Sequence, residues 1–159
     1  IEAVTGVQTC ALPIFKGKDI TDGHVDFYAR FSSKGVVVAQ LDNDPDSYEY
    51  PITRKHLEIL KAATDADGNK LQVYTLPPPL KLRSNVYTES LDFAPGYINY
   101  ITINGAVIVP HFGDAAADKY AKDLLTKLYP GRVVVQVNID PIAAGGGGIH
   151  CVTKNMPAV

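Results

Sequence analysis

Strand, strand, helix and strand are predicted twice in the same order, and this repetition constrains the fold more than any other feature of the sequence. In the first round, apolar residues alternate along 25–31 and fill 36–41, which predicts two strands. Thr53 is expected to cap a helix that stops at Asp67-Gly68-Asn69, and residues 70–76 form the closing strand.

The second round follows a long connection over residues 77–95, of a length that is usually either functional or disordered. Strands are predicted over 97–103 and 106–110, joined by a two-residue hairpin at Asn104-Gly105. Asp114 is expected to cap the second helix, and the closing strand covers 132–139.

This order predicts an α/β fold built of repeated units, and a third unit is expected to begin near Gly148. Repeat architectures bury their cores between neighbouring units, so two units are usually too few for an independent fold. The chain has 159 residues and a formal net charge of −2, which indicates a soluble globular protein with one core.

Composition also limits the partners. There is no basic stripe, so nucleic acid is not an expected partner. No apolar run approaches the roughly 20 residues of a membrane-spanning helix. The two cysteines, Cys10 and Cys151, suggest no disulfide framework and are typical of a reducing compartment, so we expect a cytoplasmic protein.

The first 14 residues differ from the rest. They lack the basic start and the apolar stretch of a signal peptide, and they resemble translated sequencing-adapter sequence. We expect residues 1–14 to be a non-native leader and residues 15–159 to belong to a single domain.

Four consecutive glycines precede the second cysteine, in the segment Gly145 to Cys151. Glycines let other groups approach the backbone, so the thiol is expected to be accessible. In an extended segment His150 would face away from Cys151, and a base would have to come from elsewhere. His24 and Asp26 are two residues apart and would share one face of a strand.

A metal site is the alternative for these residues, since His24 and Asp26 have a metal-ligand spacing that His111 or Cys151 would complete. No second closely spaced ligand pair exists, which favours a site without metal or other cofactor. His56 is expected to be solvated on its helix, and His111 to lie at the surface.

The segment from Gly23-His24-Val25-Asp26 to Phe31, the Asn104 to Pro110 segment and the glycine-rich tail together resemble the agmatine deiminase and bacterial-type peptidyl-arginine deiminase family. The resemblance implies a five-bladed α/β propeller of ββαβ units. About two and a half blades would be present here, so that residues 15–159 would be the C-terminal part of a single agmatine deiminase-like catalytic domain. Asn99 and Asn104 stand where the family commonly has asparagine, and turn geometry alone explains Asn104.

The resemblance also implies the chemistry. Cys151 would be the nucleophile, His24 the general acid and base, Asp26 a carboxylate that binds the substrate guanidinium, and Gly147 part of the substrate-binding loop. The implied reaction converts agmatine and water to N-carbamoylputrescine and ammonia, on the route to putrescine. The implied partner is this small guanidino compound, and a homo-oligomer is compatible with it.

Three alternatives stay open. The same chemistry would act on arginine in peptides, and an amidinotransferase would pass the amidino group to an amine. A catalytically incomplete fragment would be only a partly folded or assembling module. Residues 152–157 depart from the family pattern, which leaves agmatine and arginine in peptides as alternative substrates. The N-terminal acidic residues that complete the family's guanidinium site have no counterpart before Lys18.

Overall fold

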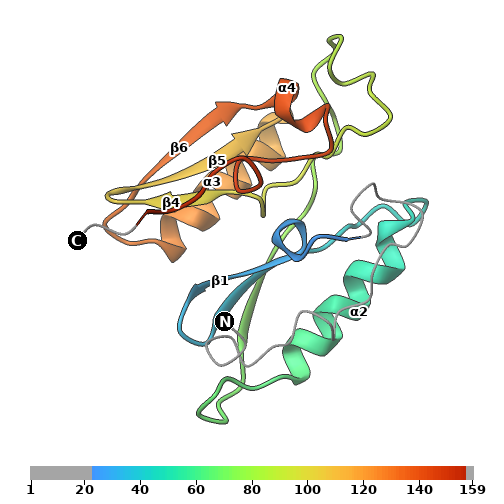
Figure 1. Cartoon of the computed structure of the whole chain (residues 1–159). Helices are drawn as coiled ribbons and strands as arrows, with labels where there is room; N and C mark the ends of the chain where they lie inside the picture. The colour runs from blue at the N-terminus through green and yellow to red at the C-terminus, as the bar shows by residue number, and fades with distance from the viewer. Residues whose placement is uncertain (1–22, 157–159) are drawn as a thin grey trace. The chain divides into compact units, whose positions relative to one another are not determined.

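The computed structural model describes residues 23–156 and divides the chain into two compact units, Ile1–Pro77 and Pro78–Val159 (Figure 1). The described part of each unit contains a three-stranded sheet and a helix of 14 residues. The chain is therefore an α/β protein with two small sheets. The propeller and its number of blades stay predictions.

The first unit follows the predicted order strand, strand, helix, strand. Its elements are η2 (Val25–Phe27), β1 (Ala29–Ser33), β2 (Val36–Gln40), α2 (Glu49–Ala62) and β3 (Gln72–Leu76). β1 pairs with β2 antiparallel, and β2 pairs with β3 parallel. Parallel strands need a crossover between them, and α2 provides it.

The core of this unit lies between the sheet and α2. Val37, Ala39, Leu60 and Leu71 bury their side chains together, and Phe31 is among the partly buried residues packed against them. Ala29 and Phe31, two positions apart in β1, both pack against this cluster, as the period-two pattern over 25–31 predicted.

Helix α2 begins earlier than the sequence indicated, at Glu49, with Tyr48 as its N-cap residue. The prediction that Thr53 caps the helix is wrong. Thr53 is buried inside α2, where its hydroxyl donates to the Glu49 carbonyl at 3.0 Å and accepts from the Asp42 N–H at 3.1 Å. Its hydrogen-bonding capacity ties the preceding loop to the helix.

The first strand is also shorter than predicted. Residues 25–27 form a 3-10 turn, η2, closed by hydrogen bonds from Phe27 N to His24 O (3.1 Å) and from Tyr28 N to Val25 O (2.9 Å). The apolar alternation over 25–31 spans this turn and β1, so periodicity alone did not reveal the boundary.

A polar cluster is buried at the N-terminal end of α2. Gln40 Nε2 donates to Glu49 Oε2 at 2.5 Å, and the Tyr28 hydroxyl donates to Glu49 Oε1 at 3.4 Å. His56 is 1% exposed and packs edge-on against the Tyr28 ring, so the expectation that it is solvated is wrong. The position of His56 on its helix suggested solvent exposure, because the sequence does not show which residues cover that position in the fold.

Burial and the nearby Asp42 carboxylate raise the pKa of Glu49 to about 7. A carboxyl whose folded-state pKa is raised stabilises the fold below its unfolded pKa, and this stabilisation is lost as pH rises through the folded value. We expect stability to fall by on the order of 2 kcal/mol between about pH 4.5 and 7 from this group. Urea unfolding across this range should show a flatter pH dependence for Glu49→Gln, and an unchanged slope would contradict the assignment.

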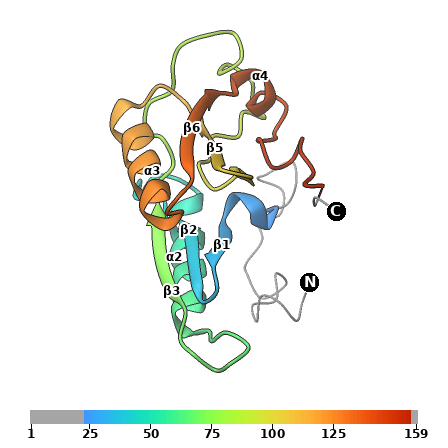
Figure 2. The same cartoon turned by 90° about the vertical axis from the view of Figure 1, so that its left-hand side faces the viewer.

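The second unit repeats the arrangement with β4 (Ile101–Ile103), β5 (Ala106–His111), α3 (Ala115–Leu128) and β6 (Val133–Asn138), followed by the short helix α4 (Asp140–Ala143). β4 pairs with β5 antiparallel, and β5 pairs with β6 parallel. Gly105 in the predicted hairpin has a φ of 77°, which confirms the turn. Figure 2 shows α4 directly after the end of β6.

Helix α3 begins where the sequence predicted. The Asp114 carboxylate accepts from the N–H groups of Ala116 and Ala117, and the Ala117 bond contributes most to holding the pKa of Asp114 below its usual range. Its second oxygen accepts from the N–H groups of Leu80 and Lys81, so Asp114 also anchors the start of the long connection.

The strand predicted over 97–103 is largely absent, since β4 covers only its last three residues. Tyr97, Ile98, Asn99 and Tyr100 are all fully buried in an irregular segment. An apolar run thus marked burial correctly and secondary structure incorrectly. No helix in residues 23–156 is long and apolar enough to cross a membrane.

Candidate active site

Cys151 lies in a turn over residues 149–152, and its side chain is exposed. Thr153 closes this turn: its hydroxyl donates to the Ile149 carbonyl at 2.7 Å, and its N–H donates to the His150 carbonyl at 3.3 Å. The segment is not extended, so the argument that strand alternation turns His150 away from the sulfur does not apply. The expected accessibility of the thiol is confirmed.

The buried Asn99 side chain holds the cysteine turn. Its Nδ2 donates to Cys151 Sγ at 3.3 Å, and its Oδ1 accepts from the His150 N–H at 2.8 Å and from the Cys151 N–H at 3.4 Å. Asn99 is 0% exposed, so no water competes for these contacts, and the amide oxygen and nitrogen are both held in place. The amide therefore orients the sulfur and supplies it with a hydrogen-bond donor.

Two of the four glycines have a clear structural reason. Gly146 has a φ of 78°, in the left-handed region. At Gly148 an added methyl group would overlap the Asn99 amide, 2.6 Å from its Cγ. At Gly147 it would meet nothing nearer than Cys151 Cβ at 3.7 Å, so no clash requires glycine there. The substrate-binding role of Gly147 stays a prediction.

Gly148→Ala should displace the cysteine turn from Asn99, because a fully buried amide cannot yield to a new methyl group. We expect a loss of about 1–3 kcal/mol in unfolding free energy. Gly147→Ala is the matched control, one residue away and in ordinary contact. Chemical denaturation of both variants checks this, and equal losses would show that the Asn99 contact is not the cause.

His24 and Asp26 lie at the 3-10 turn of the first unit. His24 is the exposed N-cap residue of η2, and Asp26 is a half-buried residue inside it. The premise that they share one face of a strand is wrong, because a 3-10 turn has about three residues per turn. The first unit contains these two residues and the second contains Cys151, and the convergence of all three stays a prediction.

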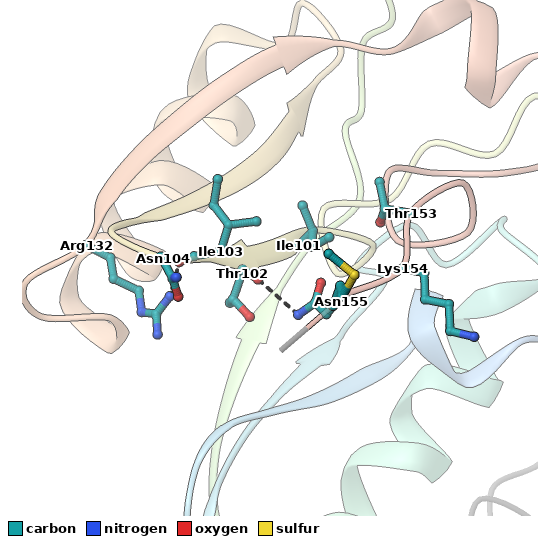
Figure 3. A pocket seen from close by; sticks show the side chains of 9 residues that line it. Ile101, Thr102, Ile103, Asn104, Arg132, Thr153, Lys154 and Asn155 are labelled. Carbon is teal, nitrogen blue, oxygen red and sulfur yellow. Dashed lines mark hydrogen bonds between the residues drawn. The ribbon is translucent and has the colours of Figure 1, made fainter. Parts of the chain in front are cut away.

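A pocket of about 760 Å³ lies beside β4 in the second unit, lined by that strand, by Arg132 and by residues 153–156 (Figure 3). Asn155 Nδ2 donates to the Thr102 carbonyl at 3.2 Å along this wall. Among residues 23–156, the lining includes the cations Arg132 and Lys154 and no carboxylate. A guanidinium needs carboxylate partners, so this pocket does not suit one.

His111 lies at the end of β5, half-buried, with its Nδ1 2.6 Å from Arg83 Nη2. A guanidinium only donates, so Nδ1 accepts here. The described residues 23–156 contain no group of three His, Cys, Asp or Glu side chains that would hold a metal ion.

A family model described as Porphyromonas-type peptidyl-arginine deiminase matches residues 5–157. The chain belongs to this family. The family resemblance inferred from the three motifs is therefore confirmed. The match begins inside residues 1–14, which lie outside the described residues, and their proposed origin as a leader stays a prediction.

Other proteins are similar to this peptidyl-arginine deiminase family member over most of its chain. A Streptomyces coelicolor protein provisionally named agmatine deiminase is 39% identical over 141 residues, which are 89% of this chain and 40% of that protein. Among solved structures, the agmatine deiminase of Enterococcus faecalis is 29% identical, with a TM-score of 0.73, and the match covers 84% of this chain and 40% of that one.

A Porphyromonas gingivalis structure, provisionally named arginine deiminase, is 30% identical with a TM-score of 0.76, over 88% of this chain and 40% of its own. The chain thus spans about 40% of the length of these relatives.

Sequence reasoning noted Asn99 as a common family residue and gave it no role. Its partners are the sulfur and two N–H groups more than 50 positions away. The available signal was an asparagine inside an otherwise apolar run, since a buried amide needs partners.

Proposed function

We propose that this chain is part of a hydrolase of guanidino groups in which Cys151 is the nucleophile. The observation that carries the proposal is the exposed sulfur held 3.3 Å from the Nδ2 of a fully buried Asn99, within a family of deiminases. An oriented, accessible sulfur with an N–H donor suits attack on an electron-poor carbon.

In the proposed reaction, the Cys151 thiolate attacks the central guanidinium carbon and forms a C–S bond. The tetrahedral adduct then breaks one C–N bond, and the departing nitrogen takes a proton from His24 and leaves as ammonia. Water adds to the resulting amidino-thioether while His24 accepts its proton. Breaking the C–S bond returns the thiolate, and the hydroxyl of the product gives its proton to the released ammonia, which leaves a neutral ureido product and ammonium with no net oxidation or reduction.

Asp26 is proposed to accept hydrogen bonds from the substrate guanidinium, because a carboxylate matches the donors of that planar cation in pairs. Gly147 is proposed to line the same site through its backbone. Both roles need His24, Asp26 and Cys151 to converge on one guanidinium carbon.

Agmatine is the proposed substrate, with N-carbamoylputrescine as the product. Its support is the naming of the relatives: the matched Enterococcus faecalis protein is an agmatine deiminase, and a Campylobacter jejuni agmatine deiminase structure carries its substrate. Peptidyl arginine is the second candidate, because the family model is described by that activity.

We propose further that activity needs the part of the fold that this chain does not span. The chain covers about 40% of its relatives, and the family's guanidinium site is expected to include acidic residues outside it. The competing proposal, an inactive module, predicts association through exposed sheet edges.

The test compares the chain alone with an assembled enzyme, formed by joining the chain to the part of the Streptomyces coelicolor relative that it does not span. We expect ammonia and a ureido product from agmatine only in the assembled enzyme. A new guanidine formed in the presence of an amine would instead indicate amidino transfer. The proposal would be refuted if the assembled enzyme elutes as a folded species on size exclusion and forms no ammonia and no ureido product from either agmatine or an arginyl peptide.

A further inference from the structure

The connection over residues 83–94, here called the strap, lies along helix α4 and is bonded to both of its ends. At the N-terminal end, Arg83 Nη1 pairs with one carboxylate oxygen of Asp140, and Asn85 Nδ2 donates to the other at 2.7 Å. Asp140 is 1% exposed. Both oxygens of a buried carboxylate are thus bonded to the strap, which makes the contact costly to break.

At the C-terminal end of α4, the strap donates hydrogen bonds to two backbone carbonyls. The Ser90 hydroxyl donates to the Ala144 carbonyl at 2.8 Å, and the Ala94 N–H donates to the Ala143 carbonyl at 3.0 Å. The last carbonyls of a helix have no partner within it, so these bonds stabilise the helix end. A four-residue helix needs such outside support, because it is too short to be stable alone.

The Arg83 guanidinium also joins the ends of two strands. It donates to Asn138 Oδ1 at 2.9 Å at the end of β6, and to the His111 carbonyl at 3.0 Å at the end of β5. The planar fork of donors allows one side chain to hold α4, β5 and β6 together, which a lysine ammonium cannot reproduce.

The glycine run continues directly from α4. Gly145 N donates to Ile142 O and Gly146 N to Ala143 O, both at 3.0 Å, so the first glycines remain bonded to the helix. Two residues later Gly148 packs against Asn99, which is bonded to Cys151. The cysteine turn is therefore held from one side by Asn99 and from the other by α4.

We propose that the Arg83–Asp140 pair positions the Cys151 sulfur against Asn99 by fixing α4 on the strap. Arg83 is a positioning residue in this account, with no contact to substrate. The proposal rests on the proposed role of Cys151 for its functional meaning. Its structural content, the dependence of the sulfur's surroundings on Arg83, stands independently of any substrate.

The test measures the rate of Cys151 alkylation by iodoacetamide across a range of pH in a Cys10→Ser chain, where Cys151 is the single thiol. For Arg83→Met we expect alkylation to slow about tenfold across the pH range, because the sulfur is no longer held in its exposed position against Asn99. Arg83→Lys should recover part of the change.

Lys119→Met is the matched control, since it also replaces a cation by methionine and removes an ion pair, that of Lys119 with Asp123 at 2.5 Å within α3. It should leave the alkylation profile in place. If Arg83→Met does not fold, Asn85→Ala decides, because it keeps the ion pair and should give a smaller change in the same direction. An unchanged profile in the folded Arg83 or Asn85 variant, or an equal change in Lys119→Met, would overturn the proposal.

This readout needs no guanidino compound. If the alkylation profile changes in Arg83→Met but the assembled enzyme has no hydrolytic activity, the proposed function is refuted and the positioning role of Arg83 is supported. If the profile is unchanged in Arg83→Met and the assembled enzyme is active, only the positioning role of Arg83 is refuted.

Discussion

Cys151→Ala in the assembled enzyme should lower the turnover of agmatine by on the order of 10⁴–10⁶-fold. The reason is chemical: without the sulfur no covalent intermediate forms, and water must attack the resonance-stabilised guanidinium directly. Ammonia release under saturating agmatine measures the loss. The turn itself should survive, because Asn99 Oδ1 bonds the backbone N–H groups of His150 and Cys151 rather than the side chain.

Cys10→Ser is the control for a general loss of thiols, and it should retain full turnover. A Cys151→Ala enzyme that keeps a tenth or more of its turnover would contradict the nucleophile assignment.

His24→Gln should reduce turnover by about 10²–10⁴-fold, the usual contribution of general acid and base catalysis, while KM changes little. Glutamine retains polarity but cannot exchange a proton with the leaving ammonia or the attacking water. Because His24 is an exposed N-cap residue and backbone hydrogen bonds close the η2 turn, its replacement should leave the turn intact. Steady-state kinetics with agmatine check the split between turnover and KM.

His150→Gln is the matched control, since His150 is also exposed and directly precedes Cys151. It should keep near-normal turnover. If the His150 variant loses activity and the His24 variant does not, the base comes from the cysteine turn and the assignment of His24 is wrong.

Much of the fold was predictable because its local signals agree with its tertiary structure. The Asn104-Gly105 hairpin and the Asp114 cap depend on backbone requirements that few residues satisfy, and both are confirmed. The two ββαβ rounds followed from these boundaries together with the apolar patterns. Helix α4 was missed because four residues are too few to show a periodicity.

Other errors arose where an apolar or alternating pattern had more than one structural solution. Residues 25–31 alternate across a 3-10 turn and a strand, and residues 97–100 are buried without being a strand. Thr53 has the chemistry of a cap, and it uses that chemistry inside α2 on the Asp42 N–H.

The candidate site was only partly visible in the sequence. Four glycines before Cys151 indicated an accessible thiol, which the exposed side chain confirms. The contribution of Asn99 and the contacts of Arg83 with α4 are long-range contacts, and no local pattern encodes them. They depend on which buried polar groups meet in the fold.

The most direct test of the central claim is mass spectrometry of the assembled enzyme, quenched with acid during turnover of agmatine and digested with protease. The account predicts a Cys151 peptide heavier by the mass of agmatine less ammonia, and slower formation of this adduct in a His24→Gln enzyme because His24 protonates the departing ammonia. Turnover of agmatine with an unmodified Cys151 peptide in both enzymes, or with the adduct on another residue, would contradict covalent catalysis by this cysteine.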